Sequence, residues 1–135
     1  MPLSDGKLSG APEEVPGQEL AVAAEALYLV NLLLFPGIGF MALGWLWVTR
    51  RHSAPPLAVA HLRQTTFVSL YGGCLIVVIS AIFITLGGLK WEWTWVLVIT
   101  YFTCIHSTLV CLGMFGLAKA MAGKPWRYPV IGPRP

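Results

Sequence analysis

The sequence predicts an all-α membrane protein with three transmembrane helices. Of its 135 residues, 56% are hydrophobic and 11% are charged. An average soluble domain has about 25% charged residues, so most of this chain is expected to lie in lipid. The apolar residues also gather in three long segments, and the basic residues lie outside these segments. These observations together predict both the helix count and the orientation.

The first region, residues 1–20, reads "MPLSDGKLSGAPEEVPGQEL" and is rich in proline, glycine and acidic residues. It lacks hydrophobic periodicity, which predicts a flexible tail. It is not expected to be a signal peptide, because acidic rather than basic residues precede the apolar run. We therefore divide the chain into this tail, a membrane domain at 21–124 and a basic aromatic interfacial tail at 125–135.

Three apolar segments follow, at about 26–48, 66–88 and 93–118. Each reaches the roughly 20 residues that cross a bilayer, and lipid requires each segment to satisfy its own backbone as a helix. Pro36 removes one backbone hydrogen bond and predicts that the first helix is kinked or broken there. The alternative is a discontinuous helix that lines a substrate or ion site, as in transporters.

Basic residues set the predicted orientation. The loop after the first segment and the C-terminal region contain no acidic residue, and their basic residues are Arg50, Arg51, Arg63, Lys119, Lys124, Arg127 and Arg134. The positive-inside rule places both regions in the cytoplasm and the N-terminus outside. We expect the bacterial cytoplasmic (inner) membrane, with the lipid bilayer as the main environment.

Aromatic residues mark the two membrane interfaces. Amphipathic rings gather at the level of the lipid headgroups. The predicted anchors are Trp91, Trp93 and Trp95 at the outer boundary, and Trp126, Arg127 and Tyr128 at the inner boundary.

Two stripes of small residues predict helix packing, because small side chains let membrane helices approach closely and hydroxyls can bond across the contact. The second segment contains Thr66, Ser69, Gly73, Ser80 and Gly87. The third contains Thr100, Thr103 and Ser107. The two stripes face each other, or they face another integral membrane subunit or a second copy.

His106 is the ionisable residue near the middle of a predicted span, and such residues are functional candidates because their burial in lipid is costly. Three roles are open: a neutral hydrogen-bonded packing residue, a contact to a quinone, lipid or partner, and an axial ligand of haem. His61 cannot share a haem with His106 in one subunit, because the helical rise separates them by roughly 15 Å. No cofactor is predicted beyond bound lipid; haem and quinone stay as alternatives.

Motifs for enzymatic chemistry are absent from the sequence. It contains no phosphate-binding loop, nucleophile elbow, paired carboxylates or cluster with metal-ligand spacing. We therefore predict no catalytic residue, no metal site and no enzyme activity. Nucleic-acid binding is not expected either, because membrane topology accounts for the basic residues.

Two phrases carry a family resemblance. They are "HLRQTTF" at 61–67 and "AKAMAGKPWRYPVIG" at 118–132. The pair resembles small bacterial membrane proteins related to the twenty-kilodalton Tic component of the chloroplast import machinery. The matching residues are His61, Gln64, Lys119, Ala120, Gly123, Arg127, Tyr128 and Pro129. The resemblance implies a compact helical bundle without known enzyme chemistry, and no import function is transferred, because kinship at the level of the fold does not carry function.

The resulting prediction is a non-enzymatic accessory or assembly subunit of a larger inner-membrane complex. Small size, packing stripes and short loops support it. One alternative is an electron-transfer, quinone-site or haem b anchoring subunit that uses His106. The other is a small translocation or transport component that uses the interruption at Pro36.

Overall fold

The computed structural model describes residues 14–134, and this part of the chain is helical without strands. Its four helices are α1 (Gln18–Leu33), α2 (Ile38–Arg50), α3 (Pro56–Gly87) and α4 (Glu92–Met121). The predicted flexible tail lies mainly in residues 1–13, which are outside the described residues. Residues 18–20 of that predicted tail belong to α1.

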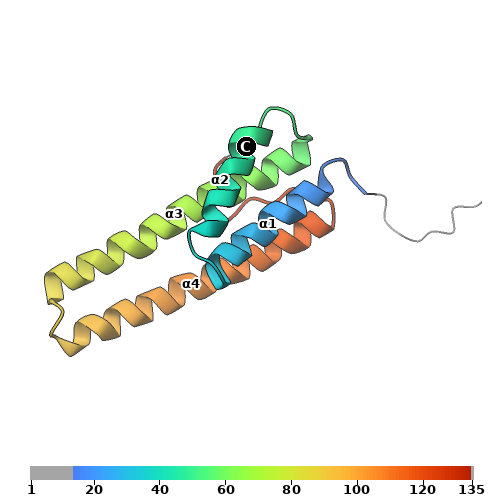
Figure 1. The fold of residues 1–135 in the computed structure, drawn as a ribbon. Helices are drawn as coiled ribbons and strands as arrows, with labels where there is room; N and C mark the ends of the chain where they lie inside the picture. The colour runs from blue at the N-terminus through green and yellow to red at the C-terminus, as the bar shows by residue number, and fades with distance from the viewer. Residues whose placement is uncertain (1–13, 135) are drawn as a thin grey trace, which may run out of the picture.

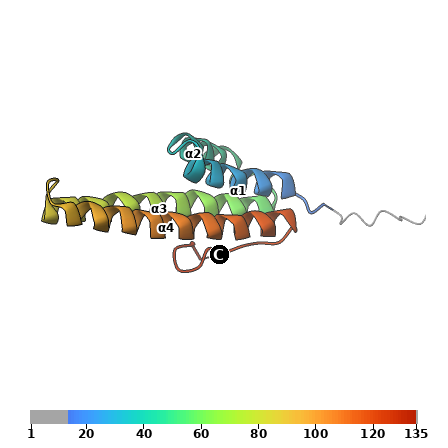
Figure 2. The ribbon, with the colours of Figure 1, turned by 90° about the horizontal axis from the view of Figure 1, so that it is seen from below.

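The helices form layers (Figures 1 and 2). The long helices α3 and α4 lie side by side and run in opposite directions. Helices α1 and α2 cover one face of this pair, and the segment after α4 returns along the opposite face (Figure 2). We call the end where α3 begins and α4 ends the basal end, and the end with the α3–α4 turn the apical end.

The core lies in the basal half of the molecule. Buried residues of α3 fall between Leu57 and Gly72, and those of α4 fall between Leu109 and Ala120, apart from Thr94 near the apical turn. Figure 1 shows the reason: α1 and α2 extend along only about half of the α3–α4 pair. The apical half is thus a helical hairpin whose large apolar side chains are exposed.

The predicted interruption at Pro36 is confirmed. The chain leaves α1 at Leu33 and resumes as α2 at Ile38, with Gly37 between them at a φ of 91°, which favours glycine. Asn31 stabilises the new start: its Oδ1 accepts hydrogen bonds from the backbone N–H of Gly37 at 2.8 Å and of Phe40 at 3.0 Å. It thereby satisfies two donors that the first turn of a helix leaves free.

The prediction of three transmembrane helices is not confirmed. With 32 and 30 residues, α3 and α4 are about 48 and 45 Å long, and both are apolar enough to cross a membrane. With 16 and 13 residues, α1 and α2 are only about 24 and 20 Å long. Each is shorter than the roughly 30 Å hydrocarbon core of a bilayer. The first apolar segment is therefore divided into two helices that are too short to cross.

The predicted orientation is not confirmed either. Gln18 at the start of α1 donates from Nε2 to the carbonyl oxygen of Met121 at the end of α4, at 2.7 Å. Gly17 lies against Pro55 and Ala58 at the start of α3. The beginning of α1 and the end of α4 thus lie at the same end of the bundle, rather than on opposite sides of a membrane.

Labelling of single cysteines tests this arrangement. In a background with Cys74, Cys104 and Cys111 replaced by alanine, we expect Glu19→Cys and Arg134→Cys to react with a membrane-impermeant maleimide from the same side of sealed vesicles. We expect Lys90→Cys, at the apical turn, to react only from the other side. All three positions are exposed. Reaction of Glu19→Cys from the Lys90 side would contradict the fold.

Candidate functional site

A cluster of buried polar side chains joins α1, α3 and the segment after α4. Its members are Glu25 from α1, His61 and Gln64 from α3, and Tyr128; we call them the polar cluster. Glu25, His61 and Tyr128 are 0% exposed and Gln64 is 5% exposed. Polar groups buried to this extent require hydrogen-bond partners, and each member has them.

The carboxyl group of Glu25 lies at the centre of the polar cluster. His61 Nδ1 is 2.6 Å from Glu25 Oε1, and the Tyr128 hydroxyl donates to Glu25 Oε2 at 2.6 Å. His61 Nε2 is 2.8 Å from the carbonyl oxygen of Lys124. A carbonyl can only accept, so Nε2 carries a hydrogen and donates it. One further proton is shared between His61 Nδ1 and Glu25 Oε1.

With this proton present, the His61–Glu25 pair carries no net charge. When the proton is on His61, the pair is an imidazolium beside a carboxylate; when it is on Glu25, the pair is a neutral imidazole beside a carboxylic acid. Both forms keep every hydrogen bond of the pair. An unpaired charge at this position would cost several kcal/mol, so His61 and Glu25 are each stable there only with the other.

Gln64 holds the segment after α4 at two points. Residues 122–134 form what we call the C-terminal strap. The side-chain oxygen of Gln64 accepts from the backbone N–H of Tyr128 at 3.1 Å, and its nitrogen donates to the carbonyl oxygen of Pro133 at 2.8 Å. Within the strap, the N–H of Gly132 donates to the carbonyl oxygen of Tyr128 at 3.0 Å. The strap is therefore fixed on α3 before and after its own turn.

Tyr128 reaches Glu25 through the layer formed by α3 and α4, because the strap and α1 lie on opposite faces of that layer (Figure 2). Gly116 of α4 leaves the passage open. A methyl group at Gly116 would lie 2.5 Å from Glu25 Oε2 and 2.9 Å from Tyr128 Oη. The Tyr28 ring packs on Tyr128 with 5.3 Å between centroids, and its hydroxyl donates to the carbonyl oxygen of Leu109 at 3.1 Å.

The polar cluster combines an acid, an imidazole and a phenol, but its geometry favours a structural role. Glu25, His61 and Tyr128 have no exposed surface, and their polar atoms bond to one another or to the backbone. Among the described residues, no group of three histidine, cysteine, aspartate or glutamate side chains could hold a metal ion. The arrangement therefore joins three separate parts of the chain.

Sequence reasoning singled out three of the four members and missed Glu25. His61, Gln64 and Tyr128 belong to the two quoted phrases, and the structure brings them together. Glu25 lies next to the start of the first predicted span and was not considered part of it. The signal was available: a lone acid inside the run "LAVAAEALYL" is costly in lipid and implies a specific partner.

The other residues of the phrases end α4 and start the strap. Gly123 has a φ of 68°, and the N–H of Lys124 donates to the carbonyl oxygen of Lys119 at 2.9 Å, which closes the end of the helix. Arg127 and Pro129 are exposed. Lys119 and Gly123 thus act through the backbone.

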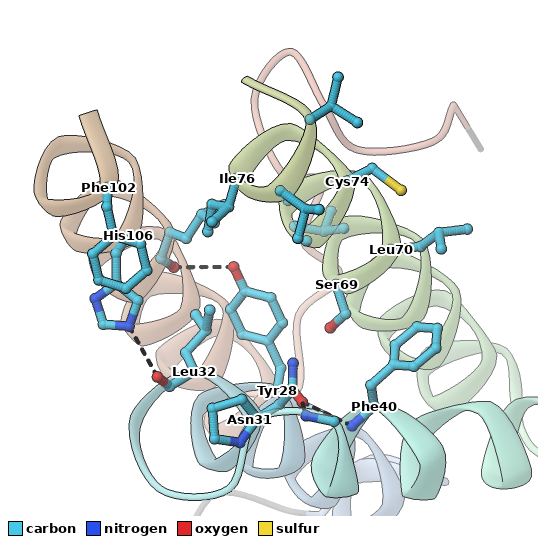
Figure 3. A pocket seen from close by; sticks show the side chains of 18 residues that line it. Tyr28, Asn31, Leu32, Phe40, Ser69, Leu70, Cys74, Ile76, Phe102 and His106 are labelled. Carbon is cyan, nitrogen blue, oxygen red and sulfur yellow. Dashed lines mark hydrogen bonds between the residues drawn. The ribbon is translucent and has the colours of Figure 1, made fainter. Parts of the chain in front are cut away.

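His106 forms a hydrogen bond to α1. Its Nε2 donates to the carbonyl oxygen of Leu32 at 2.9 Å, and its ring stacks on Phe102 with 5.1 Å between centroids (Figure 3). This contact corresponds to the first of the three predicted roles, a hydrogen-bonded packing residue. Binding of quinone or haem by His106 stays a prediction.

Three of the predicted interfacial residues lie at the apical turn of the α3–α4 pair, and the other three lie in the strap. Trp91, Trp93 and Trp95 are exposed at the apical turn, and the indole N–H of Trp95 donates to the carbonyl oxygen of Leu89 at 2.9 Å. Trp126 lies in the strap, where it stacks on Phe115 with 6.2 Å between centroids. Contact of these four tryptophans with lipid headgroups stays a prediction. The predicted place of Tyr128 at the headgroup level is wrong, because its ring is 0% exposed and its hydroxyl bonds to Glu25.

The two small-residue stripes do not face each other within this chain. Ser69 on α3 is buried, Ser80 and Thr66 are half-buried, and Gly87 lies against Thr94. Gly73 borders open space. On α4, all three residues of the predicted stripe are exposed: Thr100, Thr103 and Ser107. A contact between these α4 residues and another subunit stays a prediction.

Comparison with known proteins shows which family the chain belongs to. A family model described as the MamF/MmsF magnetosome magnetite crystal formation protein family matches residues 18–134. The chain belongs to this family. The match corrects the resemblance to relatives of the Tic component, which is wrong. It covers all four helices of this MamF/MmsF protein and the strap, and so includes the whole polar cluster. No curated protein and no solved structure matches the chain.

Removal of the Tyr128 hydroxyl tests the polar cluster. In Tyr128→Phe, Glu25 Oε2 loses its donor, so we expect the free energy of unfolding in detergent to fall by about 1–3 kcal/mol. Tyr101→Phe is the matched control: its hydroxyl donates to the carbonyl oxygen of Leu75 at 2.9 Å at an exposed position, and a loss below about 1 kcal/mol is expected. Trypsin should also cut the strap of Tyr128→Phe faster. Equal stability of the two variants would contradict the structural role.

Alkaline titration tests the environment of Tyr128. Burial, followed by the nearby Glu25 carboxyl group, raises the pKa of Tyr128 far above its ordinary value of about 10. The stabilising contribution of the neutral phenol is therefore complete below pH 10 and is lost only as the pH rises beyond it. Between pH 9 and 11, folded wild type and Tyr128→Phe should give equal tyrosinate absorbance. After denaturation, the wild type should show one additional titrating tyrosine.

Proposed function

We propose that this protein is a non-enzymatic integral membrane protein of the magnetosome that contributes to magnetite crystal formation as an accessory subunit of a membrane assembly. One observation carries the proposal: the match to the magnetosome family extends over residues 18–134 and thus over all four helices. The two long apolar helices support the placement in a membrane.

The polar cluster supports a non-enzymatic role. A catalytic acid or base has to reach a proton of the substrate, directly or through one water. Glu25 and His61 are 0% exposed and bond to each other at 2.6 Å. Their chemistry is therefore used to hold α1, α3 and the strap together.

The surface of α4 supports a partner. Thr100, Thr103 and Ser107 follow a spacing of three and four residues, which places them on one side of the helix. All three are exposed on a helix that is apolar enough to cross a membrane. Small hydroxyl residues on such a surface let a second helix approach closely and bond across the contact. We propose this stripe as the contact with another membrane subunit or a second copy.

Complementation in a magnetite-forming cell that lacks the protein tests both parts. We expect loss of the protein to reduce the size or number of crystals seen by electron microscopy, and the wild type to restore them. The triple variant Thr100→Leu, Thr103→Leu and Ser107→Leu should insert normally, migrate without partners in native electrophoresis and fail to restore the crystals.

Thr85→Leu is the matched control. Thr85 is also an exposed threonine in a long apolar helix, and its hydroxyl bonds to the carbonyl oxygen of Ala81 at 2.7 Å within α3. It should restore the crystals fully. Unchanged crystals in cells without the protein would overturn the role in crystal formation, whereas full restoration by the triple variant would overturn only the interface on α4.

A further inference from the structure

A hollow of about 530 Å³ lies beside the break between α1 and α2 (Figure 3). Its walls come from all four helices and are mainly apolar. Tyr28 and Asn31 line it from α1, Phe40 from α2, nine residues between positions 68 and 78 from α3, and Phe102 with His106 from α4. The volume is typical of sites for small molecules, about 300–1,000 Å³. An open apolar hollow of this size in a membrane protein is accessible to lipid.

Ser69 supplies a polar group in this apolar wall. Ser69 is 9% exposed, and its side chain points toward the hollow (Figure 3). Its hydroxyl has no hydrogen-bond partner among the described residues. Four threonine hydroxyls in these helices bond to a backbone carbonyl four residues earlier, as Thr65 does to His61 at 2.9 Å, whereas the buried hydroxyls of Thr66 and Thr94 also lack a partner but do not line the hollow. A buried hydroxyl without a partner is unfavourable, so the Ser69 hydroxyl is a free donor for a ligand with an acceptor oxygen.

The depth of Ser69 identifies which acceptor is available. Gly87, the last residue of α3, is 18 positions beyond Ser69, or about 27 Å along the helix. The hydrocarbon core of a bilayer is about 30 Å thick. With Trp91 at the apical interface, Ser69 lies at the opposite boundary of the hydrocarbon. The acyl ester carbonyls of phospholipids lie at this boundary, and they are hydrogen-bond acceptors.

The length of the hollow matches one leaflet. From Ser69 to Val78, the lining of α3 extends over nine positions, or about 14 Å. One leaflet contributes about 15 Å, half of the hydrocarbon core. An acyl chain whose ester lies at Ser69 can therefore follow α3 to the end of the hollow without leaving its own leaflet.

The charges at the basal end suit a phosphate headgroup. Arg63 lies on the same side of α3 as Leu70 and Cys74, because positions 63, 67, 70 and 74 follow the helical spacing. It is two turns nearer the basal end than Leu70. The sequence contains no acidic residue between Glu25 and Glu92, so neither α2, α3 nor the loop between them carries an acid that would repel this headgroup.

We propose that this hollow binds one acyl chain of a phospholipid from the basal leaflet, and that the chain's ester carbonyl oxygen accepts a hydrogen bond from the Ser69 hydroxyl. The inference rests on membrane insertion of α3 and α4 and does not depend on the role in crystal formation. It gives Ser69, predicted as a helix-packing residue, a specific ligand contact.

Two glycines allow a matched pair of variants. Gly73 lines the hollow, and a methyl group there meets no atom within 4 Å outside its own helix, so the side chain of Gly73→Leu starts in open space and extends into the hollow. Gly44 in α2 also meets no atom within 4 Å and does not line the hollow. Both changes replace a helical glycine by leucine and bring the same gain in helix propensity.

The full-length protein is reconstituted in vesicles of phosphatidylethanolamine and phosphatidylglycerol, extracted in mild detergent and analysed by native mass spectrometry. We expect the wild type and Gly44→Leu to retain one phospholipid per chain, and Gly73→Leu to retain at least tenfold less, with unchanged circular dichroism. Absence of retained phospholipid on the wild type, or equal retention by Gly73→Leu, would overturn the proposal.

The ester contact is tested with ether lipids of the same headgroups, which lack the carbonyl oxygens. We expect the wild type to retain the ester lipid about two- to tenfold better than the ether lipid, the effect of one hydrogen bond. Ser69→Ala should bind both lipids equally, because it keeps the shape of the hollow and removes the donor. A preference for ester lipid that persists in Ser69→Ala would show that the contact is assigned to the wrong residue.

Discussion

The structure depends on the burial of one carboxyl group, that of Glu25. Such a group is tolerated in a core only when both oxygens are bonded and a partner compensates its charge. His61 and Tyr128 meet both conditions, at 2.6 Å each. Because these partners come from α3 and from the strap, one side chain of α1 determines how three layers of the molecule are joined. The hydrogen bonds of Gln64 then extend the same attachment along the strap.

Hydropathy predicted the two long helices, and the proline at position 36 predicted the interruption, because these features depend on local sequence. It did not predict the path of the chain after Pro36, since the sum of apolar residues over 26–48 is the same for one crossing helix and for two short helices. The orientation depended on this count. The sequence singled out His61, Gln64 and Tyr128 as motif residues but did not predict that they meet in a polar cluster, because the link between Glu25 and Tyr128 requires a passage at Gly116 that no sequence pattern shows. The phrases were informative about packing but suggested the wrong family.

The molecule consists of two unlike halves. The basal half has four helices, buried polar contacts and the strap, whereas the apical half is a helical hairpin without cover from the rest of the described chain. Soluble proteins could not expose so many large apolar side chains, but lipid is a suitable solvent for them. This division separates a part that is held by internal hydrogen bonds from a part whose large apolar side chains are exposed. It agrees with a member of a magnetosome family that is embedded in a membrane.

The hydrogen bond between His106 and Leu32 has a simple origin. In an unbroken helix, the carbonyl oxygen of Leu32 would accept from the N–H of residue 36, and proline has none. His106 supplies that donor from a different helix. The imidazole of His106 thus replaces the backbone N–H donor that proline lacks. A residue of α4 thereby satisfies a carbonyl group that the break in the first apolar segment would leave without a partner. Pro36 and His106 therefore depend on each other structurally, because the proline leaves the carbonyl oxygen of Leu32 without a donor in its own helix and the histidine donates to it.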